Sequence, residues 1–263
     1  MRTGRRTGGF TLIEVIVVIA VISILAAMAV PYAVRILDQS REDVTKKQMV
    51  EIHRAIMGDP AVPTAGYLGD MGRLPVVPPT VASPTDLNTQ GGQPAVSYGM
   101  LGVKYGWSGP YVNVGFSTGA NLVDGWGMNL GYNNPGAGQI RSAGPDRVLG
   151  NADDIIYPSS AVVPSGGLLV NLYVWNTNST KYIQNPKLNQ VDAMGVTFYY
   201  SSNGNQTSVT NMLAPPVSFN GYHAGLHAVT ATCSLKNQAA VTGQAVVYVP
   251  GNNQQMTVDL YLQ

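Results

Sequence analysis

Cysteine and histidine are scarce in this sequence. Among its 263 residues there is one cysteine, Cys233, so the chain cannot form an internal disulfide. A lone cysteine in a strand pattern is usually a small core residue. The three histidines, His53, His223 and His227, are scattered, and no nucleophile, base and orienting group can be assembled around them. We therefore expect a protein that is not an enzyme.

Charge is also sparse. Lysine and arginine number 15 and aspartate and glutamate 14, which together make 11% of the residues and a net charge of +1. The sequence has no basic patch that could hold phosphates, so we expect no nucleic-acid partner. After Pro60 the chain is rich in Gly, Asn, Ser, Thr and Tyr, a bias that suits β-strands and turns. The composition favours a secreted or surface-exposed structural protein.

What the chain does have is a long apolar run near its N-terminus, interrupted by one acidic residue, Glu14. The run extends from Phe10 to Val30, about 21 residues, and at ~1.5 Å per residue a helix of that length just spans the ~30 Å core of a bilayer. A charge at the centre of a membrane helix disfavours insertion by roughly 2.5–3.5 kcal/mol, so such residues usually mark a function with a specific partner. Residues 1–9 carry three arginines and no acid, which predicts that the N-terminus stays on the cytoplasmic side.

The stretch Gly9-Phe10-Thr11-Leu12-Ile13-Glu14-Val15 resembles the class III signal of type IV pilins and type II secretion pseudopilins. The resemblance implies that a prepilin peptidase cuts after Gly9, removes residues 1–9 as a leader and methylates the new amine of Phe10. The alternative is an ordinary signal anchor that happens to contain a glutamate.

Cleavage would place a free ammonium on Phe10 close to the Glu14 carboxylate, in surroundings short of water. Two such charges ~4 Å apart attract by about 4 kcal/mol at an effective dielectric of ~20. Glu14 can meet its own N-terminus or that of a staggered neighbour, and we expect the second arrangement to dock incoming subunits during assembly. Pro31 interrupts the helical pattern, and the resemblance implies that it marks a kink or a stretch that melts on assembly.

The helical pattern continues past the membrane, so we predict one helix over residues 10–57, with its membrane-spanning half at about 10–30. In the second half, apolar positions recur at spacings of four, three and four at Thr45, Met49, Ile52 and Ile56. This narrow face should lie on a globular domain. The charged residues on the other faces either contact neighbouring subunits or are simply solvated.

Residues 58–158 are predicted to form the first globular domain, and they carry three short motifs. In order, these resemble the globular domain of the major pseudopilin of type II secretion: Asp70-Met71-Gly72-Arg73-Leu74-Pro75, Gly106-Trp107-Ser108-Gly109-Pro110-Tyr111, and Asp124-Gly125-Trp126-Gly127 with Tyr132. The resemblance implies a small antiparallel sheet packed on the helix. The intervening residues 76–93 are expected to be an irregular loop.

The end of this domain, residues 140–155, contains three carboxylates and several glycines within about a dozen residues. Ca²⁺ takes six to eight oxygens at about 2.3–2.6 Å, and the spacing here does not fit an EF-hand. The segment resembles the calcium loop of the major pseudopilin, which implies side-chain ligands Asp146, Asp153 and Asp154 and further carbonyl ligands at Ala143 and Asn151. The alternative is an acidic turn whose carboxylates are merely solvated.

Residues 159–167 are predicted to be a linker, and period-two alternation follows over 168–263. Short strands separated by turn signals predict a β-sandwich. Residues 221–230 loosely resemble the late strand of transthyretin-like or carboxypeptidase-regulatory-like domains, and an immunoglobulin-like sandwich is the other option. Because the major pseudopilin normally ends near its calcium loop, this domain is an addition to that pattern.

Together these features predict an α+β chain in which a long N-terminal helix, half membrane-spanning and half amphipathic, packs on a small antiparallel-sheet domain that an all-β sandwich follows. The predicted function is that of a structural subunit of a type II secretion pseudopilus, anchored in a bacterial inner membrane with its globular domains in the periplasm. The implied partners are other copies of the chain, prepilin peptidase, the inner-membrane assembly platform and minor pseudopilins. The alternative is a type IV pilin whose C-terminal domain is adhesive or binds a ligand.

Overall fold

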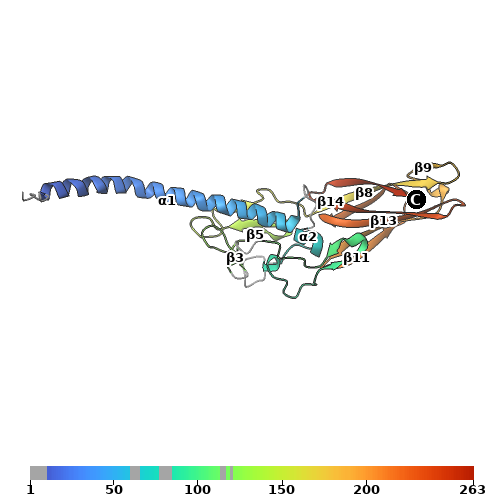
Figure 1. Cartoon of the computed structure of the whole chain (residues 1–263), viewed down its shortest axis with the longest axis horizontal. Helices are drawn as coiled ribbons and strands as arrows, with labels where there is room; N and C mark the ends of the chain where they lie inside the picture. The colour runs from blue at the N-terminus through green and yellow to red at the C-terminus, as the bar shows by residue number, and fades with distance from the viewer. Residues whose placement is uncertain (1–10, 60–65, 77–84, 113–116, 119–120) are drawn as a thin grey trace, which may run out of the picture.

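The structure, a computed structural model, describes residues 11–59, 66–76, 85–112, 117–118 and 121–263. Its parts lie in a row: a long helix protrudes from a small domain built around its second half, and a β-sandwich lies beyond the end of that helix (Figure 1). The predicted fold class is confirmed, because the long N-terminal helix is followed by several sheets and a β-rich C-terminal part.

The helix α1 spans Leu12–Met57, 46 residues, which corresponds to about 69 Å at 1.5 Å per residue. Its apolar face in the second half is confirmed, since Thr45, Met49, Ile52 and Ile56 are all fully buried. The periodicity therefore identified the side of α1 that packs on the globular domain.

The domain beside α1 is built from short elements. It contains a short helix, α2, and three small sheets, β1–β2, β3–β4 and β5–β6–β7, each with antiparallel pairing. The predicted small sheet domain thus takes the form of three separate small sheets, of which β5–β6–β7 contacts α1 through β6 and β7, and β1–β2 contacts α2 through β2. The bounds are α2 Gly66–Met71, η1 Thr85–Leu87, β1 Ser97–Tyr98, η2 Met100–Gly102, β2 Lys104–Tyr105, β3 Ser117–Thr118, β4 Asn121–Leu122, β5 Gly131–Asn134, η4 Pro135–Ala137, β6 Gln139–Ser142 and β7 Ile155–Tyr157.

The second part of the chain is a β-sandwich of two sheets. One sheet has the strand order β11–β10–β13–β14, and the other has β12–β8–β15 with β9 beside β8. The bounds are β8 Ser165–Asn176, β9 Lys181–Gln184, η5 Leu188–Gln190, β10 Val191–Ser202, β11 Asn205–Asn211, β12 Val217–His223, β13 Gly225–Leu235, β14 Ala240–Val249 and β15 Gln255–Leu262.

Alternating side chains from both sheets fill the core of the sandwich. Val170, Leu172 and Val174 of β8 are fully buried, as the period-two pattern predicts. Cys233 is also fully buried and free, which confirms its role as a small core residue. The strand β15 runs parallel to β8, whereas the other paired strands of the sandwich are antiparallel.

The predicted linker at 159–167 is too long at its C-terminal end, because β8 begins at Ser165. Gly166 and Gly167 pair with strand β12 instead of forming a turn. A Cβ at Gly166 would lie 1.8 Å from the carbonyl oxygen of Pro250, so the backbone approaches too closely for any other residue. Gly166, which suggested a linker, is thus a strand residue at which this contact requires glycine.

The two domains are fastened together at the end of α2. The Ser201 hydroxyl donates to the backbone oxygen of Asp70 at 2.6 Å, and the Gly204 N–H donates to the backbone oxygen of Met71 at 2.7 Å. A Cβ at Gly72, whose φ is +64°, would lie 1.9 Å from the Ser201 oxygen, so this contact requires glycine. The sandwich is therefore held at the C-terminal end of α2 by these two hydrogen bonds and by the close approach at Gly72.

Candidate functional site: the uncovered helix and the acidic loop

The first half of α1 carries an apolar surface that no described part of the chain covers. Leu12 is 78% exposed, Leu25 62% and Val30 61%. Among the described helices, α1 is the one long and apolar enough to cross a membrane. The apolar surface also continues past Val30, through Tyr32 and Leu37. A surface of this kind needs either lipid or other helices around it.

The N-terminal end of α1 is capped by its own acidic residue. The Thr11 backbone N–H donates to Glu14 Oε2 at 3.3 Å, and the Thr11 hydroxyl lies 3.4 Å from the same oxygen. A carboxylate at this position satisfies an N–H left free at the helix start and interacts favourably with the helix dipole. The predicted processing residues, Gly9 and Phe10, lie outside the described residues.

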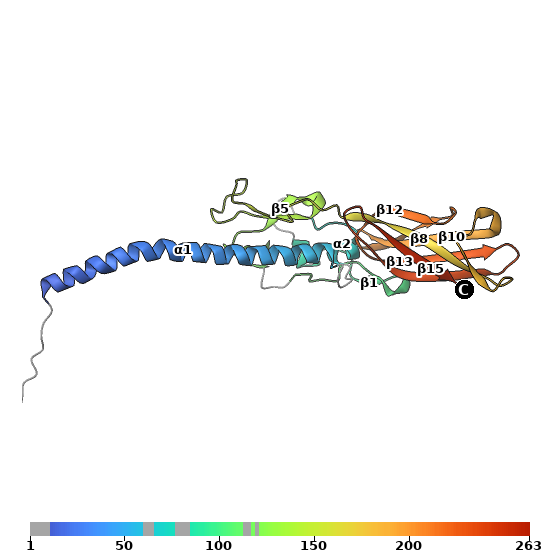
Figure 2. The same cartoon turned by 90° about the horizontal axis from the view of Figure 1, so that it is seen from above.

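Pro31 lies inside α1, and the helix continues on both sides of it. Figure 2 shows that α1 curves along its protruding half, which contains this proline. Proline removes one main-chain hydrogen bond and bends a helix away from the side that carries the proline ring. The predicted kink and the observed curvature therefore fall in the same half of α1.

The motif at residues 124–127 holds the first domain on α1. The Gly125 N–H donates to the Thr45 hydroxyl at 2.9 Å, and the Trp126 Nε1–H points to the Asp38 carboxylate at 3.4 Å. A Cβ at Gly125 would lie 2.4 Å from the backbone oxygen of Arg41, so glycine permits this approach. The motif thus attaches the first domain to α1, and we call Gly125 and Trp126, with their contacts to α1, the clasp.

The carboxylate of Asp124 links this clasp to the acidic loop, which we define as residues 143–154 between β6 and β7. It accepts hydrogen bonds from the N–H groups of Trp126 and Met128 at 2.9 Å each and from the Ser142 hydroxyl at 2.7 Å. Asp124 is 4% exposed, and this set of donors compensates the burial of its charge. Ser142 ends β6, so the acidic loop starts from a position that is fixed relative to α1.

Within the loop, Asp154 is paired with an arginine. Arg141 on β6 donates from Nε to Asp154 Oδ2 at 2.8 Å and forms a second contact through its NH2 group. The N–H groups of Gly150 and Asn151 also donate to Oδ2, at 2.8 and 3.2 Å. Burial would raise the pKa of Asp154, but the Gly150 hydrogen bond and the Arg141 guanidinium outweigh it and hold the pKa below its ordinary value.

The other predicted ligands lie around this ion pair without forming a shared cage. Asp146 is exposed and accepts from the Val148 N–H at 2.8 Å and from the Asn151 side chain. Asp153 Oδ2 accepts from the Asp146 N–H at 3.4 Å, and Ala143 is buried at the start of the loop. In the described part of the chain, no three acidic, histidine or cysteine side chains are gathered so as to hold a metal.

One observation nevertheless fits a cation at this loop. Asp154 Oδ1 is buried and has no hydrogen-bond partner within the described residues, and the Asp154 side chain is 2% exposed. A buried carboxylate oxygen without a donor is costly, and a cation is the kind of group that it would bind. The Arg141 guanidinium supplies positive charge on the opposite side of the same carboxylate.

Asp70 joins two of the other motifs. Its Oδ2 accepts from the Ser108 hydroxyl at 2.5 Å and from the Tyr111 hydroxyl at 2.8 Å. Burial raises the pKa of Asp70, and these two hydrogen bonds oppose that shift. The three side chains line a cavity of about 700 Å³, whose wall also includes Leu226 of the sandwich. Sequence motifs that are 38 residues or more apart thus meet at one carboxylate beside the domain boundary.

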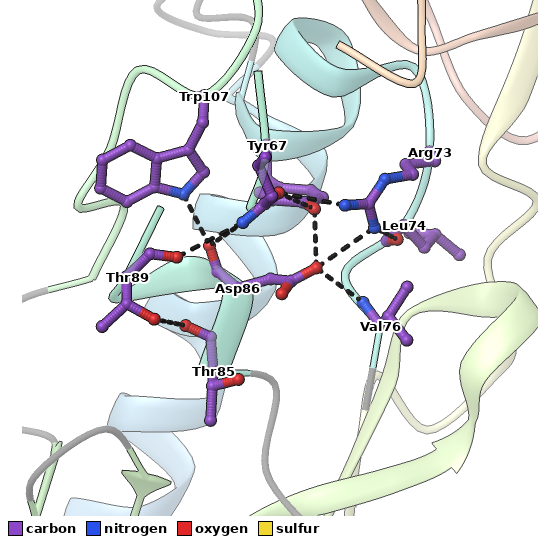
Figure 3. A network of polar contacts seen from close by, with 9 residues as sticks. Tyr67, Arg73, Leu74, Val76, Thr85, Asp86, Thr89 and Trp107 are labelled. Carbon is purple, nitrogen blue, oxygen red and sulfur yellow. Dashed lines mark hydrogen bonds and ion pairs between the residues drawn. The ribbon is translucent and has the colours of Figure 1, made fainter. Parts of the chain in front are cut away.

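Sequence reasoning missed a second polar cluster, which is centred on Asp86 (Figure 3). Asp86 Oδ2 accepts from the Tyr67 hydroxyl at 2.9 Å, from Arg73 at 3.2 Å and from the Val76 N–H at 3.1 Å. The Asp86 backbone oxygen accepts from the Trp107 indole N–H at 2.7 Å. Arg73 and Trp107 stand in the motifs, but no local signal identified Asp86 as their shared partner.

Comparisons with known proteins bear on the N-terminal end of the chain. The family model described as the prokaryotic N-terminal methylation motif matches residues 4–30, which include the cleavage-type glycine, Glu14 and the apolar run. Neither the curated proteins nor the solved structures that were searched contain a significant match to the chain. The methylation motif, together with an N-terminal helix that fits membrane anchoring, indicates a type IV pilin-like protein of the kind that is processed as a prepilin.

Proposed function

We propose that this chain is a structural subunit of a type II secretion pseudopilus, which polymerises through α1 after prepilin peptidase removes residues 1–9. The observation that carries the proposal is the uncovered apolar surface of α1. It covers the membrane-spanning length and continues past it to Val44, which is 44% exposed. Fully burying one large aliphatic side chain contributes about 1.5–3 kcal/mol, so packing several α1 helices side by side would supply a large driving force outside the bilayer.

Glu14 would determine the axial stagger between neighbouring α1 helices. In the free subunit its carboxylate is engaged with the Thr11 N–H, at the end of the helix where a cleaved Phe10 amine would lie. In a row of staggered helices the same carboxylate can accept from the amine of a neighbour. Since an unpaired charge among apolar helices is costly, only staggers that pair the two groups are favourable.

The resemblance of the first globular domain supports the secretion branch of this family. Its three motifs, which resemble the major pseudopilin in order, have defined structural tasks here: Gly125 contacts α1, Asp70 joins Ser108 and Tyr111, and Arg73 belongs to the Asp86 cluster. We propose further that the acidic loop binds calcium, supported by the unpartnered Asp154 Oδ1. Asp146, Asp153 and Asp154, with the carbonyls of Ala143 and Asn151, would supply oxygen ligands and thereby stiffen the loop.

The proposed function also implies a location and a set of partners. The subunit would sit in a bacterial inner membrane by α1, with both globular domains in the periplasm. It would then join other copies of the chain and minor pseudopilins on an assembly platform. Its role is mechanical, and we propose no catalytic activity for it.

A second candidate function is that of a type IV pilin with an adhesive C-terminal domain. The observation that favours it is the position of the sandwich, which lies at the end of the molecule farthest from the membrane-spanning half of α1 (Figures 1 and 2). A domain placed there is well positioned to touch something outside the filament.

Deleting the gene in the native organism separates the two functions. Loss of proteins from the culture supernatant, with surface attachment retained, supports the secretion role, whereas the opposite pattern supports the adhesive pilin. Complementation with the wild-type gene should restore the lost function. Complementation with a Gly9→Val gene, which blocks cleavage, should not restore it, and full restoration by this variant would contradict both filament proposals.

A further inference from the structure

Four aromatic side chains gather on the outer face of the sheet formed by β8, β9 and β15. Tyr173 and Tyr261 stack with their ring centroids 4.8 Å apart, and Tyr182 meets Tyr261 edge-on at 5.3 Å. Trp175 completes the group, with its ring 5.1 Å from that of Tyr182. We call these four residues the aromatic platform. The strand β9, which carries Tyr182, lies toward the end of the sandwich that is farthest from α1 (Figure 1).

The platform contributes nothing to the core of the sandwich. Along β8 the buried residues alternate with Tyr173 and Trp175, which therefore face the solvent side. The same alternation places Tyr261 outward between Leu260 and Leu262, and it is 53% exposed. The other three side chains are half-buried beside it. None of the four aromatic residues belongs to the hydrophobic cluster between the two sheets or packs against it. A contiguous aromatic cluster on an outer face is typical of a binding site.

Polar groups border the rings, and one of them is a carboxylate. The next row of the outer face holds Asn171 and Asp259, joined by a hydrogen bond of 2.8 Å from the asparagine side chain. The Gln263 side chain donates to the Tyr182 hydroxyl at 2.6 Å, which holds that ring in place. The rings are thus fixed before any ligand arrives, which lowers the entropic cost of binding.

The charges of this face exclude several classes of partner. Neither β8 nor β15 contains a lysine or arginine, and Lys181 at the start of β9 is the one cation among the three strands. A nucleic acid or an anionic lipid surface would need several cations here. Strand addition by a peptide at β8 is excluded as well, since β15 pairs with one edge and β12 and β9 with the other.

We propose that the aromatic platform binds the sugar rings of a neutral polysaccharide. A pyranose ring presents a face of polarised C–H groups, which suits the electron-rich face of an aromatic ring, and a rim of hydroxyls that both donate and accept hydrogen bonds. The platform offers both kinds of partner, with the aromatic rings beside the side chains of Asn171, Asp259 and Gln263. The proposal concerns the sandwich alone and does not depend on whether the filament serves secretion or adhesion.

The test uses the full mature chain in a polyoxyethylene detergent, because maltoside and glucoside detergents carry sugar headgroups that would compete. The probes are cellohexaose, chitohexaose and maltohexaose, with a heparin fragment as an acidic comparison. Binding is followed by calorimetry and by tryptophan fluorescence. We expect at least one neutral oligosaccharide to bind and to change the fluorescence of Trp175, and the heparin fragment not to bind.

Variants connect the binding to the platform. Tyr261→Ala should weaken binding by about tenfold or more, as removal of a central aromatic contact typically does, whereas Tyr261→Phe should retain most of it. Trp175→Phe should abolish the fluorescence change, because Trp107 and Trp126 lie in the other domain. The matched control is Tyr98→Ala, which removes a tyrosine that is 67% exposed on β1, and it should bind like the wild type.

Three results would overturn the proposal. The first is failure of all three neutral oligosaccharides to bind a wild-type protein that unfolds cooperatively. The second is binding that Tyr261→Ala leaves unchanged. The third is a concentration-dependent dimer that Tyr261→Ala abolishes, which would assign the platform to contact between two copies of the chain. Because the assay uses purified protein, its failure leaves the filament function untouched.

Discussion

The carboxylate of Glu14 lies 3.3 Å from the backbone nitrogen of Thr11, so a side chain of α1 itself accepts the hydrogen bond of the N–H at the helix start. This contact has two separable components: a hydrogen bond that a neutral acceptor could also make, and a negative charge that it could not. The first stabilises the helix end by about 0.5–2 kcal/mol. The second is what a neighbouring ammonium would recognise.

Glu14→Gln separates the two components. The glutamine oxygen can still accept from the Thr11 N–H, so we expect the variant to insert into the membrane and to be cleaved normally. It should fail to assemble, because it cannot pair with the Phe10 amine of another subunit. Filament yield after shearing, normalised to the membrane pool, measures this outcome. Assembly of Glu14→Gln at the wild-type level would show that the charge has no role in docking.

A second prediction concerns the clasp between the first domain and α1. Thr45→Val keeps the shape of a fully buried side chain but removes the oxygen that accepts from the Gly125 N–H. An unsatisfied buried donor costs about 1–3 kcal/mol, and we expect the first domain to unfold at a correspondingly lower denaturant concentration. Trp126, which lies in the clasp, provides the fluorescence signal. The matched control is Thr232→Val, which changes an exposed threonine in the sandwich. It should leave the denaturant concentration at which the first domain unfolds unchanged.

Local periodicity was enough to predict the faces of α1 and β8 that are buried. Ile52 and Val174, for example, repeat at the helical and strand periods of their segments, and both lie in a core. The parallel pairing of β15 with β8 could not be predicted in the same way. Val258 and Val170 are paired across the two strands although 88 residues separate them in sequence. The alternation within a strand predicts which face is buried, but it does not predict which strand pairs with it.

In the candidate site, too, residues that are close in sequence could be predicted, whereas partners that only folding brings together could not. The acidic residues of the loop were found because they are close together in sequence, but the partner of Asp154 was not. Arg141 lies one strand away, and antiparallel pairing of β6 with β7 brings it to the carboxylate. No local pattern marked Asp86, since most of its partners, among them Tyr67 and Trp107, come close to it only when the chain is folded.

The third prediction concerns calcium and the acidic loop. If calcium binds at Asp154, it should raise the melting temperature of the wild-type protein, and a chelator should reverse the shift. Arg141→Gln removes the guanidinium from Oδ2, so that only the N–H groups of Gly150 and Asn151 still donate to this oxygen. We expect the loss of the opposite charge to destabilise the calcium-free protein. Calcium should then stabilise Arg141→Gln by more than it stabilises the wild type.

Asp154→Asn is the counterpart of that experiment. It removes the charge that both the arginine and the cation would use, so we expect it to unfold at a lower temperature and to respond little to calcium. Asp192→Asn, an exposed aspartate in the sandwich, should keep the wild-type response. Equal calcium responses in the wild type, Arg141→Gln and Asp154→Asn would mean that the loop is no more than an acidic turn.

The last prediction is a loss of stability in mild acid, caused by His227. The residue is 2% exposed, its ring centroid lies 5.1 Å from that of Phe198, and Nε2 donates to the backbone oxygen of His223 at 2.8 Å. Within the described residues Nδ1 has no partner, so protonation there would bury an unpaired N–H. Burial accordingly lowers the pKa of His227 from 6.5 to about 4.

The sign of the effect follows from proton uptake. Between pH 6.5 and about 4 the unfolded chain binds a proton at this histidine and the folded chain does not, so the free energy of unfolding falls as the pH falls. The full difference is on the order of 3 kcal/mol, and it is complete below the lower pKa. His53 and His223, whose pKa values are also lowered by burial, act in the same direction, and Asp70, whose pKa is raised, acts against them.

Comparing the wild type with His227→Gln isolates the single residue from those other groups. The glutamine side chain can still donate to the His223 oxygen but does not titrate, so its curve of unfolding free energy against pH should be flatter over this range. Denaturant unfolding at a series of pH values measures both curves. Parallel curves for the two proteins would mean that a proton reaches His227 in the folded state as easily as in the unfolded one, and that its burial in the sandwich is not what the structure indicates.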